Sequence, residues 1–216
     1  MTNEHVPARR VVAVSPERLP GWLDRFAERH GNIQLRHDNS TVWVTAVDGA
    51  VASIRVPFGP LDSHSDLRTA LLDHVRQDRR VGAVLVRRGG YAVGVFHGRR
   101  LLASKVGQAY VQARTKAGGW SQQRYARRRA EQTGHLYAKA ADATALVLLP
   151  ALPDLEAVVG GGDAAGVDAV LADPRLEPLR TLRSGPVLPT PDPRLDVLRR
   201  FADQLRAVTI TLNDLA

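Results

Sequence analysis

The chain has 216 residues, and its 30 Lys and Arg against 22 Asp and Glu give a formal net charge of +8, which favours a polyanionic partner such as nucleic acid. A hydrophobic content of 44% is ample for a buried core. The absence of cysteine excludes disulfides, thiolate nucleophiles and cysteine-containing zinc sites, and the cytosol is the expected compartment. No apolar run is long enough to cross a membrane, and the N-terminus lacks the pattern of a secretory signal, so we expect no membrane association.

The first quarter of the chain alternates strand and helix signals. Residues 11–15 form a short β-branched run, and residues 16–29 place apolar side chains at helical spacing before Gly31, which predicts a strand followed by a helix that ends at the glycine. Residues 41–47 and 50–56 are β-branched runs separated by an Asp-Gly dipeptide. This pattern predicts an antiparallel hairpin.

The middle of the chain predicts a meander between two helices. Residues 66–79 carry apolar side chains at every fourth position on a polar background, which indicates an amphipathic helix. Residues 81–88, 91–97 and 99–106 resemble three strands with glycine turns, and we expect one sheet of five or more strands. A spacing of three and four over residues 121–149 predicts one long helix.

The last third continues the alternation. Residues 155–163 read as a strand that enters a glycine loop, followed by a short helix over 166–172. The proline-rich residues 174–193 predict a loop with little regular structure. A helix through Leu205 and a strand over 207–212 close the chain. The order of elements predicts a single mixed α/β domain, with a mixed sheet and flanking helices.

The segment TKAGGWSQQRYARRR, at positions 115–129, combines a flexible tip with a basic stem. Gly118 and Gly119 allow backbone conformations that are closed to other residues, and Gln122 and Gln123 follow at a helix start, where backbone N–H groups are available to bind an oxyanion or phosphate. A glutamine cannot act as a general base, but it can orient a water molecule. Between residues 107 and 139 one acid faces seven basic residues, namely Arg114, Lys116, Arg124, Arg127, Arg128, Arg129 and Lys139.

A helical arrangement separates these charges from an apolar stripe. The stripe comprises Ala126, Ala130, Thr133, Tyr137, Ala140, Thr144 and Val147, and we expect it to dock on the sheet. The opposite face comprises Arg124, Arg128, Glu131 and His135, with Arg127 beside them. This face is suited to phosphate, although a charged helix face is often only a solvated surface.

The motif GGWSQQRYARRR resembles the glutamine loop of the Vms-like release factor (VLRF) family in its actinobacterial branch. That family is related to the catalytic middle domain of archaeal and eukaryotic class-one release factors. The resemblance implies one RNase H-like α/β domain over residues 1–216, with a protruding Gly-Gln loop that leads into a long basic helix. It also implies a cytoplasmic peptidyl-tRNA hydrolase that rescues stalled ribosomes by inserting this loop into the peptidyl transferase centre of the large subunit.

The resemblance assigns roles by position. Gly118 and Gly119 match the glycines that let the loop fold into the ribosomal site, and Gln122 matches the catalytic glutamine that follows serine. Trp120 and Ser121 intervene between the glycines and the amide, and Gln123 follows, so either glutamine can be the one that acts at the ester. Ribosomal RNA or tRNA phosphates would be contacted by Arg114, Lys116, Arg124, Arg127, Arg128 and Arg129. Trp120 either stacks on a base or packs under the loop. No metal or organic cofactor is implied, and we expect a monomer.

Two other functions compete with this hypothesis. A metal-dependent RNase H-like nuclease needs clustered carboxylates, for which the candidates are Asp48, Asp62, Asp66 and Asp73. A non-catalytic ribosome- or RNA-binding module would use the basic helix alone. The seven histidines form no HExxH pattern. The sequence VVGGGDAAG at 158–166 lacks the lysine of a phosphate-binding P-loop, so we interpret it as a tight structural turn.

Overall fold

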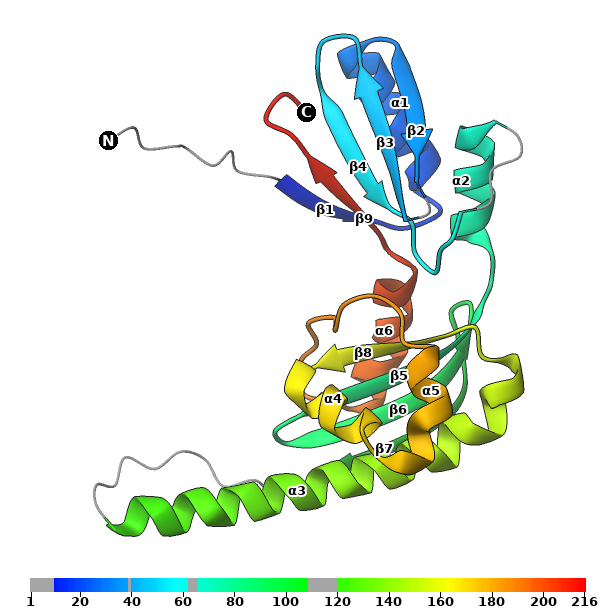
Figure 1. Ribbon diagram of the computed structural model, residues 1–216. Helices are drawn as coiled ribbons and strands as arrows, with labels where there is room; N and C mark the ends of the chain where they lie inside the picture. The colour runs from blue at the N-terminus through cyan, green and yellow to red at the C-terminus, as the bar shows by residue number, and fades with distance from the viewer. Residues whose placement is uncertain (1–9, 39, 62–65, 109–119) are drawn as a thin grey trace. The chain divides into compact units, whose positions relative to one another are not determined.

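The computed structural model describes residues 10–38, 40–61, 66–108 and 120–216, and the side chains of 120–129 lie outside the description. The chain forms two compact units (Figure 1). The first unit comprises Met1–Gln77 together with Arg206–Ala216, and the second comprises Asp78–Leu205. The expectation of a single functional domain over the whole chain stays a prediction.

The first unit is built on a five-stranded antiparallel sheet with the strand order β1-β9-β4-β3-β2. Its elements are β1 (Arg10–Val14), α1 (Leu19–His30), β2 (Ile33–His37), β3 (Thr41–Ala46), β4 (Val51–Arg55), α2 (Leu67–Arg76) and β9 (Val208–Leu212). The predicted hairpin is confirmed by the pairing of β3 with β4. The sequence analysis missed β2, because none of its residues is fully buried and its pattern is therefore weak.

One face of this sheet carries the core of the first unit. Alternate residues of β3, such as Val42 and Val44, are fully buried, whereas the residues between them are only partly buried. This alternation is expected for a strand with one face on the core. Leu19, Leu23 and Phe26 of α1 belong to the same cluster, so α1 covers this face.

The second unit contains a four-stranded mixed sheet with the strand order β7-β6-β5-β8. Its elements are β5 (Arg80–Arg87), β6 (Gly90–His97), β7 (Arg100–Gln108), α3 (Trp120–Leu148), η1 (Leu149–Asp154), β8 (Ala157–Gly162), α4 (Ala164–Leu171), η2 (Pro174–Leu176), α5 (Glu177–Thr181) and α6 (Leu195–Arg206). The predicted meander is confirmed by the antiparallel pairs β5–β6 and β6–β7, and β8 pairs with β5 in parallel.

Helices cover both faces of the second sheet. Alternate residues of β5 and β6 pack against α3, α4 and α5 in one cluster. On the opposite face, α6 approaches so closely that a Cβ at Gly94 would lie 3.1 Å from Leu198, and one at Gly161 would lie 3.0 Å from Phe201. The unit is therefore a three-layer α/β/α arrangement, which Figure 1 shows in ribbon form. The mixed α/β class is confirmed.

Two expectations about the fold were wrong. The strands form two sheets rather than one, because β9 pairs with β1 and β4, whereas β8 pairs with β5. The segment 174–193 is also not a plain loop. It contains η2 and α5, whose Leu176 and Leu179 are fully buried under α3. Proline is compatible with the first positions of both short helices, so the proline content did not indicate a loop.

Glycines at the paired ends of β6 and β7 allow their backbones to meet immediately before residue 109. A Cβ at Gly90 would lie 2.7 Å from the carbonyl oxygen of Gly107, and one at Gly107 would lie 2.3 Å from the ring of Tyr91. No side chain fits at either position without a shift of its neighbours. The end of the strand that leads to the glycine-glutamine segment is therefore fixed by close packing.

No helix among the described residues is long and apolar enough to cross a membrane.

We predict that Gly90→Ala lowers the free energy of unfolding by about 1–3 kcal/mol, because the added methyl group overlaps a backbone carbonyl that cannot rotate away. Gly89→Ala is the matched control, since a Cβ at Gly89 has no neighbour within 4 Å. The control is expected to change the free energy by no more than about 0.5 kcal/mol. Urea unfolding of both variants measures the difference, and equal stabilities would contradict the close approach.

Candidate functional site

The two glutamines of the motif lie in the first turn of α3. The helix begins at Trp120, so Ser121, Gln122 and Gln123 follow within that turn. The first four N–H groups of an α-helix have no acceptor within the helix. The helix start thus brings free backbone donors and two carboxamide residues together on one short segment.

The other candidate residues lie beyond the description. Gly118, Gly119, Arg114 and Lys116 belong to 109–119. The side chains of the remaining candidates are also outside the description, and these are Trp120, Ser121, Gln122, Gln123, Arg124, Arg127, Arg128 and Arg129. Their predicted roles in catalysis and RNA binding therefore stay predictions.

The C-terminal half of α3 is embedded in the core. Among the described side chains of α3, Leu136 is the first that is fully buried, and Ala140, Thr144 and Leu148 are also buried. The hydroxyl of Thr144 donates a 2.7 Å hydrogen bond to the carbonyl oxygen of Ala140, so burial of this polar group is compensated. This half of the helix packs on β5 and β6 and cannot move independently of the sheet.

The N-terminal half of α3 has no buried side chain among residues 130–135. Ala130, Gly134 and His135 are exposed, and Figure 1 shows this end of the helix extending past the strands of its sheet. At about 1.5 Å per residue, the segment from Trp120 to Leu136 is about 24 Å long. The predicted docking stripe was thus wrong at Ala130 and holds from Thr133, which is half-buried like Tyr137, towards the C-terminus, while the side chain of Ala126 lies outside the description.

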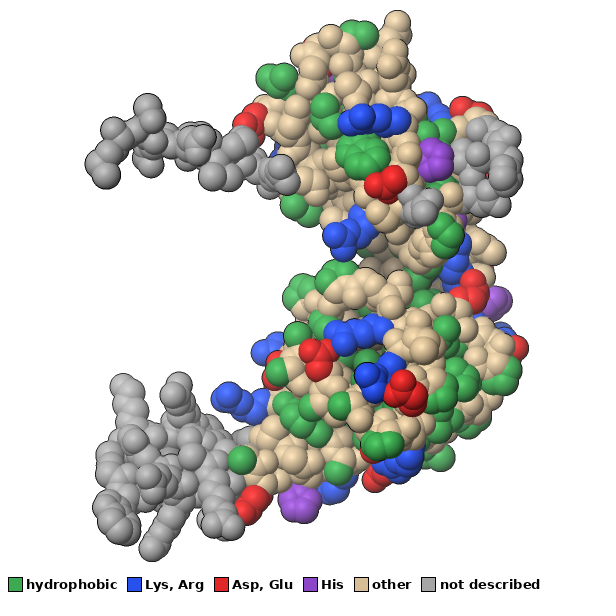
Figure 2. Space-filling model, in the orientation of Figure 1, with side chains coloured by type: hydrophobic (Ala, Val, Ile, Leu, Met, Phe, Trp, Pro, Cys, Tyr) green, Lys and Arg blue, Asp and Glu red, His purple; other side chains and the backbone are tan. Residues whose placement is uncertain are grey.

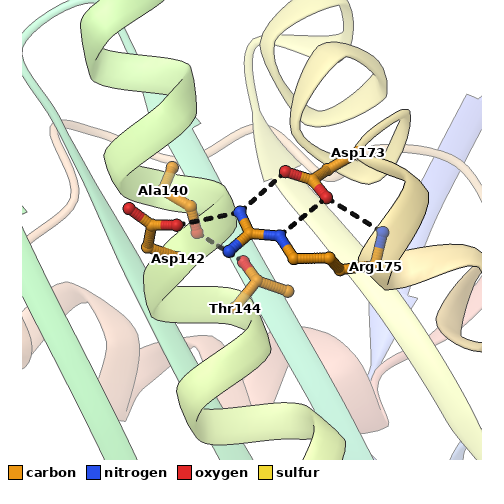
Figure 3. A network of polar contacts seen from close by, with 5 residues as sticks. All are labelled: Ala140, Asp142, Thr144, Asp173 and Arg175. Atoms are coloured by element: carbon orange, nitrogen blue, oxygen red, sulfur yellow. Dashed lines mark hydrogen bonds and ion pairs between the residues drawn. The ribbon is translucent and has the colours of Figure 1, made fainter.

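A salt-bridge network ties the embedded half of α3 to η2, as Figure 3 shows. The guanidinium of Arg175 donates to Asp142 of α3 at 2.8 Å. It also makes two hydrogen bonds, of 3.0 and 2.8 Å, to the carboxylate of Asp173. Hydrogen bonds from the Arg175 side chain, followed by the one from its backbone N–H, lower the pKa of Asp173 from 3.8 to about 2. Sequence reasoning missed this cluster, although the Asp-Pro dipeptide before Arg175 is typical of a helix start.

The middle of α3 lies against the beginning of α4. A Cβ at Gly166 of α4 would lie 3.2 Å from the ring of Tyr137, so the glycine lets the two helices approach. Burial raises the pKa of the Tyr137 hydroxyl, the charge of Asp163 adds to the effect, and Arg88 opposes it. The tyrosine is therefore neutral at physiological pH, and we assign it a packing role.

The charges of the second unit are distributed unevenly. Outside the segment 107–139, several arginines of this unit form ion pairs with acids, as in the pairs Arg183–Asp168, Arg200–Asp196 and Arg99–Asp203, each at 2.6 Å. Figure 2 shows such basic and acidic side chains beside one another on one face of the unit. Within 107–139 a single acid, Glu131, accompanies seven basic residues, so at least six positive charges have no acid of the segment to pair with.

Two further exposed cations lie near the helix and were not singled out from the sequence. Lys105 is paired in register with Val93, whose side chain is in the core under α3. Residues opposite each other on paired strands share a face, so Lys105 lies on the α3 side of the edge strand β7. Arg88, in the turn between β5 and β6, is close enough to Tyr137 to influence its pKa. Both add positive charge beside the helix.

Two of the four carboxylates proposed for a nuclease, Asp48 and Asp66, have structural roles in the first unit. Asp48 accepts hydrogen bonds from the Ala50 N–H at 2.9 Å and pairs with Nδ1 of His30 at 2.8 Å, and Asp66 caps α2 by accepting from Thr69. Asp73 lies on the exposed side of α2, and Asp62 lies outside the described residues. In the ranges that the structure describes, no group of three His, Asp or Glu side chains is arranged to hold a metal ion.

The glycine run of 158–166 serves packing. Gly162 has a φ of +94°, and a Cβ there would lie 2.4 Å from the carbonyl oxygen of Val86. Asp163 caps α4 by accepting from the N–H of Ala165. The interpretation of this segment as a tight structural turn is confirmed.

The comparison with protein families gives one match. The model described as acVLRF1, the Actinobacteria/chloroflexi VLRF1 release factor, matches residues 79–211. This segment runs from β5 to β9 and includes every candidate residue of the site. No curated protein sequence matches the chain significantly.

Two solved archaeal structures resemble the chain at low identity. The translation termination factor aRF1 aligns with a TM-score of 0.46 and 15% identity. A structure described as an archaeal protein aligns with a TM-score of 0.40 and 14% identity. Each alignment covers 91% of this chain and 66% of the solved one, so the chain spans just under two thirds of their length.

We predict that Arg175→Met destabilises the protein in a pH-dependent way. The pKa of Asp173 is lowered in the folded state, so its pairing contributes stability above about pH 4 and loses it as the pH falls towards 2. Wild type and variant should therefore differ in unfolding free energy at neutral pH and converge below about pH 2. Arg180→Met, which removes a pair within α5, is the control. A pH-independent difference measured by denaturant titration would contradict this assignment.

Proposed function

The chain belongs to the Actinobacteria/chloroflexi VLRF1 release factor family, whose model matches residues 79–211, and on this premise we propose that it hydrolyses the ester of peptidyl-tRNA on stalled ribosomes or large subunits. Membership in a release factor family makes its role one related to translation termination or rescue. The finer proposal is that the reaction releases the nascent chain. Its partners are then ribosomal RNA of the large subunit and peptidyl-tRNA, in the cytoplasm.

The observation that carries the proposal is the position of the glutamines at the exposed end of α3. They follow Gly118 and Gly119 after Trp120 and Ser121, lie in the first helical turn, and precede a stretch of helix without a buried side chain among residues 130–135. A helix of this kind holds its first turn at a defined distance from the domain core. This geometry suits delivery of a carboxamide to a reaction centre that lies within a larger RNA assembly.

The proposed chemistry needs little from the protein. Water attacks the carbonyl carbon of the ester, a tetrahedral oxyanion forms, and the 3′-oxygen of the tRNA leaves and takes up a proton. The carboxamide of Gln122 orients the water, and a free N–H of the helix start donates to the oxyanion, with Gln123 as the alternative residue. Positioning and oxyanion stabilisation provide most of the rate gain in such reactions. The proposal includes no metal or cofactor.

The basic stem explains how the tip is held in register. The arginines of the first turns of α3 follow the glutamines directly, and their phosphate contacts would fix the helix on RNA without reading sequence. The four strands in the order β7-β6-β5-β8, with helices on both faces, support assignment of the second unit to the RNase H-like fold. We propose that the chain acts as a monomer.

We predict that Gln122→Ala reduces single-turnover release of a nascent peptide by about two orders of magnitude, because the carboxamide that positions the attacking water is lost while the backbone N–H groups of the helix start remain. Alanine favours helix, so the fold of α3 is preserved. Gln123→Ala tests the alternative residue, and Gln34→Ala, an exposed amide on β2, is the control. Release rates are measured on purified stalled ribosomal complexes. Equal rates for all four proteins would contradict the catalytic proposal and leave a binding module.

We predict that binding to purified large subunits weakens steeply with salt. Each neutralised phosphate contributes about 0.7–0.9 to the slope of log K against log salt, so six contacts give a slope of about −4 to −5. Arg127→Gln with Arg128→Gln should reduce the slope by about 1.4–1.8. Arg194→Gln with Arg199→Gln, exposed arginines elsewhere in the second unit, should leave it unchanged. An equal loss from both pairs would contradict a specific role of the stem.

A further inference from the structure

The first unit contains a small cavity with a basic rim and an aromatic wall. Its volume is about 160 Å³, and it lies between α1 and the strands β1 and β9. From α1 it is lined by Trp22, Phe26 and His30, which succeed one another at helical spacing. Every residue that lines it lies outside the segment 79–211 matched by the release factor family, and Leu212 and Ala216 follow the end of that segment.

The aromatic wall is a ladder of three rings along one face of α1. Trp22 and Phe26 are stacked at 5.3 Å between centroids with 21° between planes, and Phe26 and His30 follow at 4.7 Å. The ring of His30 is held in place because its Nδ1 is hydrogen-bonded to Asp48. Phe26 and His30 are themselves buried, so Trp22 is the ring of this ladder that a ligand can reach. Because Trp22 is already held by its stacking on Phe26, a further flat ring that binds to it loses little entropy.

Three arginines line the same cavity. Arg25 and Arg29 lie one turn apart on α1, and Arg10 comes from the edge strand β1, where it is paired in register with Leu212. No acidic side chain lines the cavity, and none of these arginines forms an ion pair within the described ranges of the chain. The helix dipole favours a cation such as Arg29 in the last turn of α1. It offers no reason for Arg10 on a neighbouring strand.

The size of the cavity limits its occupant. Pockets for drug-sized ligands measure about 300–1,000 Å³, so this one accepts a single ring rather than a whole cofactor. The cavity is lined by the apolar side chains of Val12 and Leu212 as well as by the arginines. This lining suits a group that is flat and neutral at one end and anionic at the other. A nucleotide has this composition, since its base stacks on aromatic rings and its phosphate pairs with guanidinium groups.

We propose that this cavity binds one nucleotide of single-stranded RNA, with the base against Trp22 and the flanking phosphates on Arg10, Arg25 and Arg29. The first unit then supplies an RNA contact separate from the basic stem of α3. The proposal goes beyond the hydrolase function and does not depend on it, because no residue of the cavity belongs to the candidate catalytic site.

The test measures binding of a labelled single-stranded oligouridylate to the full chain over a range of salt concentrations. Arg25→Gln with Arg29→Gln should lower the salt slope by about 1.4, because each phosphate contact to a single strand contributes about 0.7. Arg55→Gln with Arg76→Gln removes the same charge from exposed positions of the first unit outside the cavity and should leave the slope unchanged. Equal losses from both pairs would overturn the proposal.

A second variant tests the aromatic wall. Trp22→Leu should weaken binding of the oligouridylate about tenfold at constant salt slope, as expected for one lost stacking contact. A 4-thiouridine in the probe should cross-link to α1 in the wild type. A cross-link to other segments alone, or competition by an acidic peptide but not by uridine monophosphate, would overturn the nucleotide assignment. Gln122→Ala should bind the probe like the wild type even if peptide release fails, so the two proposals fail separately.

Discussion

The one-sided packing of α3 is the constraint on which the candidate site depends. From Leu136 onward the helix is buried against β5 and β6, whereas no side chain of residues 130–135 is buried. A free helix of about sixteen residues is only marginally stable in water. Continuity with the buried half removes the cost of helix nucleation, so the exposed half can stay helical with polar and charged side chains. A polar segment is thereby available to contact RNA without losing its structure.

Positive charge is distributed unevenly in this protein. In the second unit, several exposed arginines pair with acids on neighbouring elements, and such surface pairs contribute little stability each. Their effect is to cancel the field over most of that surface. The segment 107–139 has only one acid for its seven basic residues, and no acidic side chain lines the cavity of the first unit. Neither place therefore has enough acids to balance its positive charge. Under the proposed functions, long-range attraction to RNA would therefore be directed to these places rather than to the whole surface.

Local signals predicted most elements, and long-range contacts account for what was missed. The Asp-Gly hairpin, the meander and the extent of α3 follow from turn chemistry and periodicity. The separation into two sheets does not, because β9 joins β1 and β4 across most of the chain. Periodicity also gives the direction of a helix face but not the extent of the sheet beneath it, which is why Ala130 was expected in the core. The Asp142–Arg175 pair and the position of Arg10 at the cavity could not be predicted either, because each joins segments that only the fold brings together. The glutamine motif, by contrast, can be recognised in the sequence alone.

The stiffness of α3 has a mechanical consequence. An α-helix anchored at one end acts as a lever whose fulcrum is the buried residue nearest its free end, which among the described side chains is Leu136. Over an arm of about 24 Å, a tilt of about 10° at the fulcrum displaces Trp120 by about 4 Å, which is close to the width of a single side chain. Small adjustments where the helix leaves the sheet, beside Tyr137 and Gly166, are therefore amplified at the glutamine end. The direction of the N-terminal end of α3 is therefore set by packing in the core, far from the glutamines that this end would carry to the ester under the proposed function.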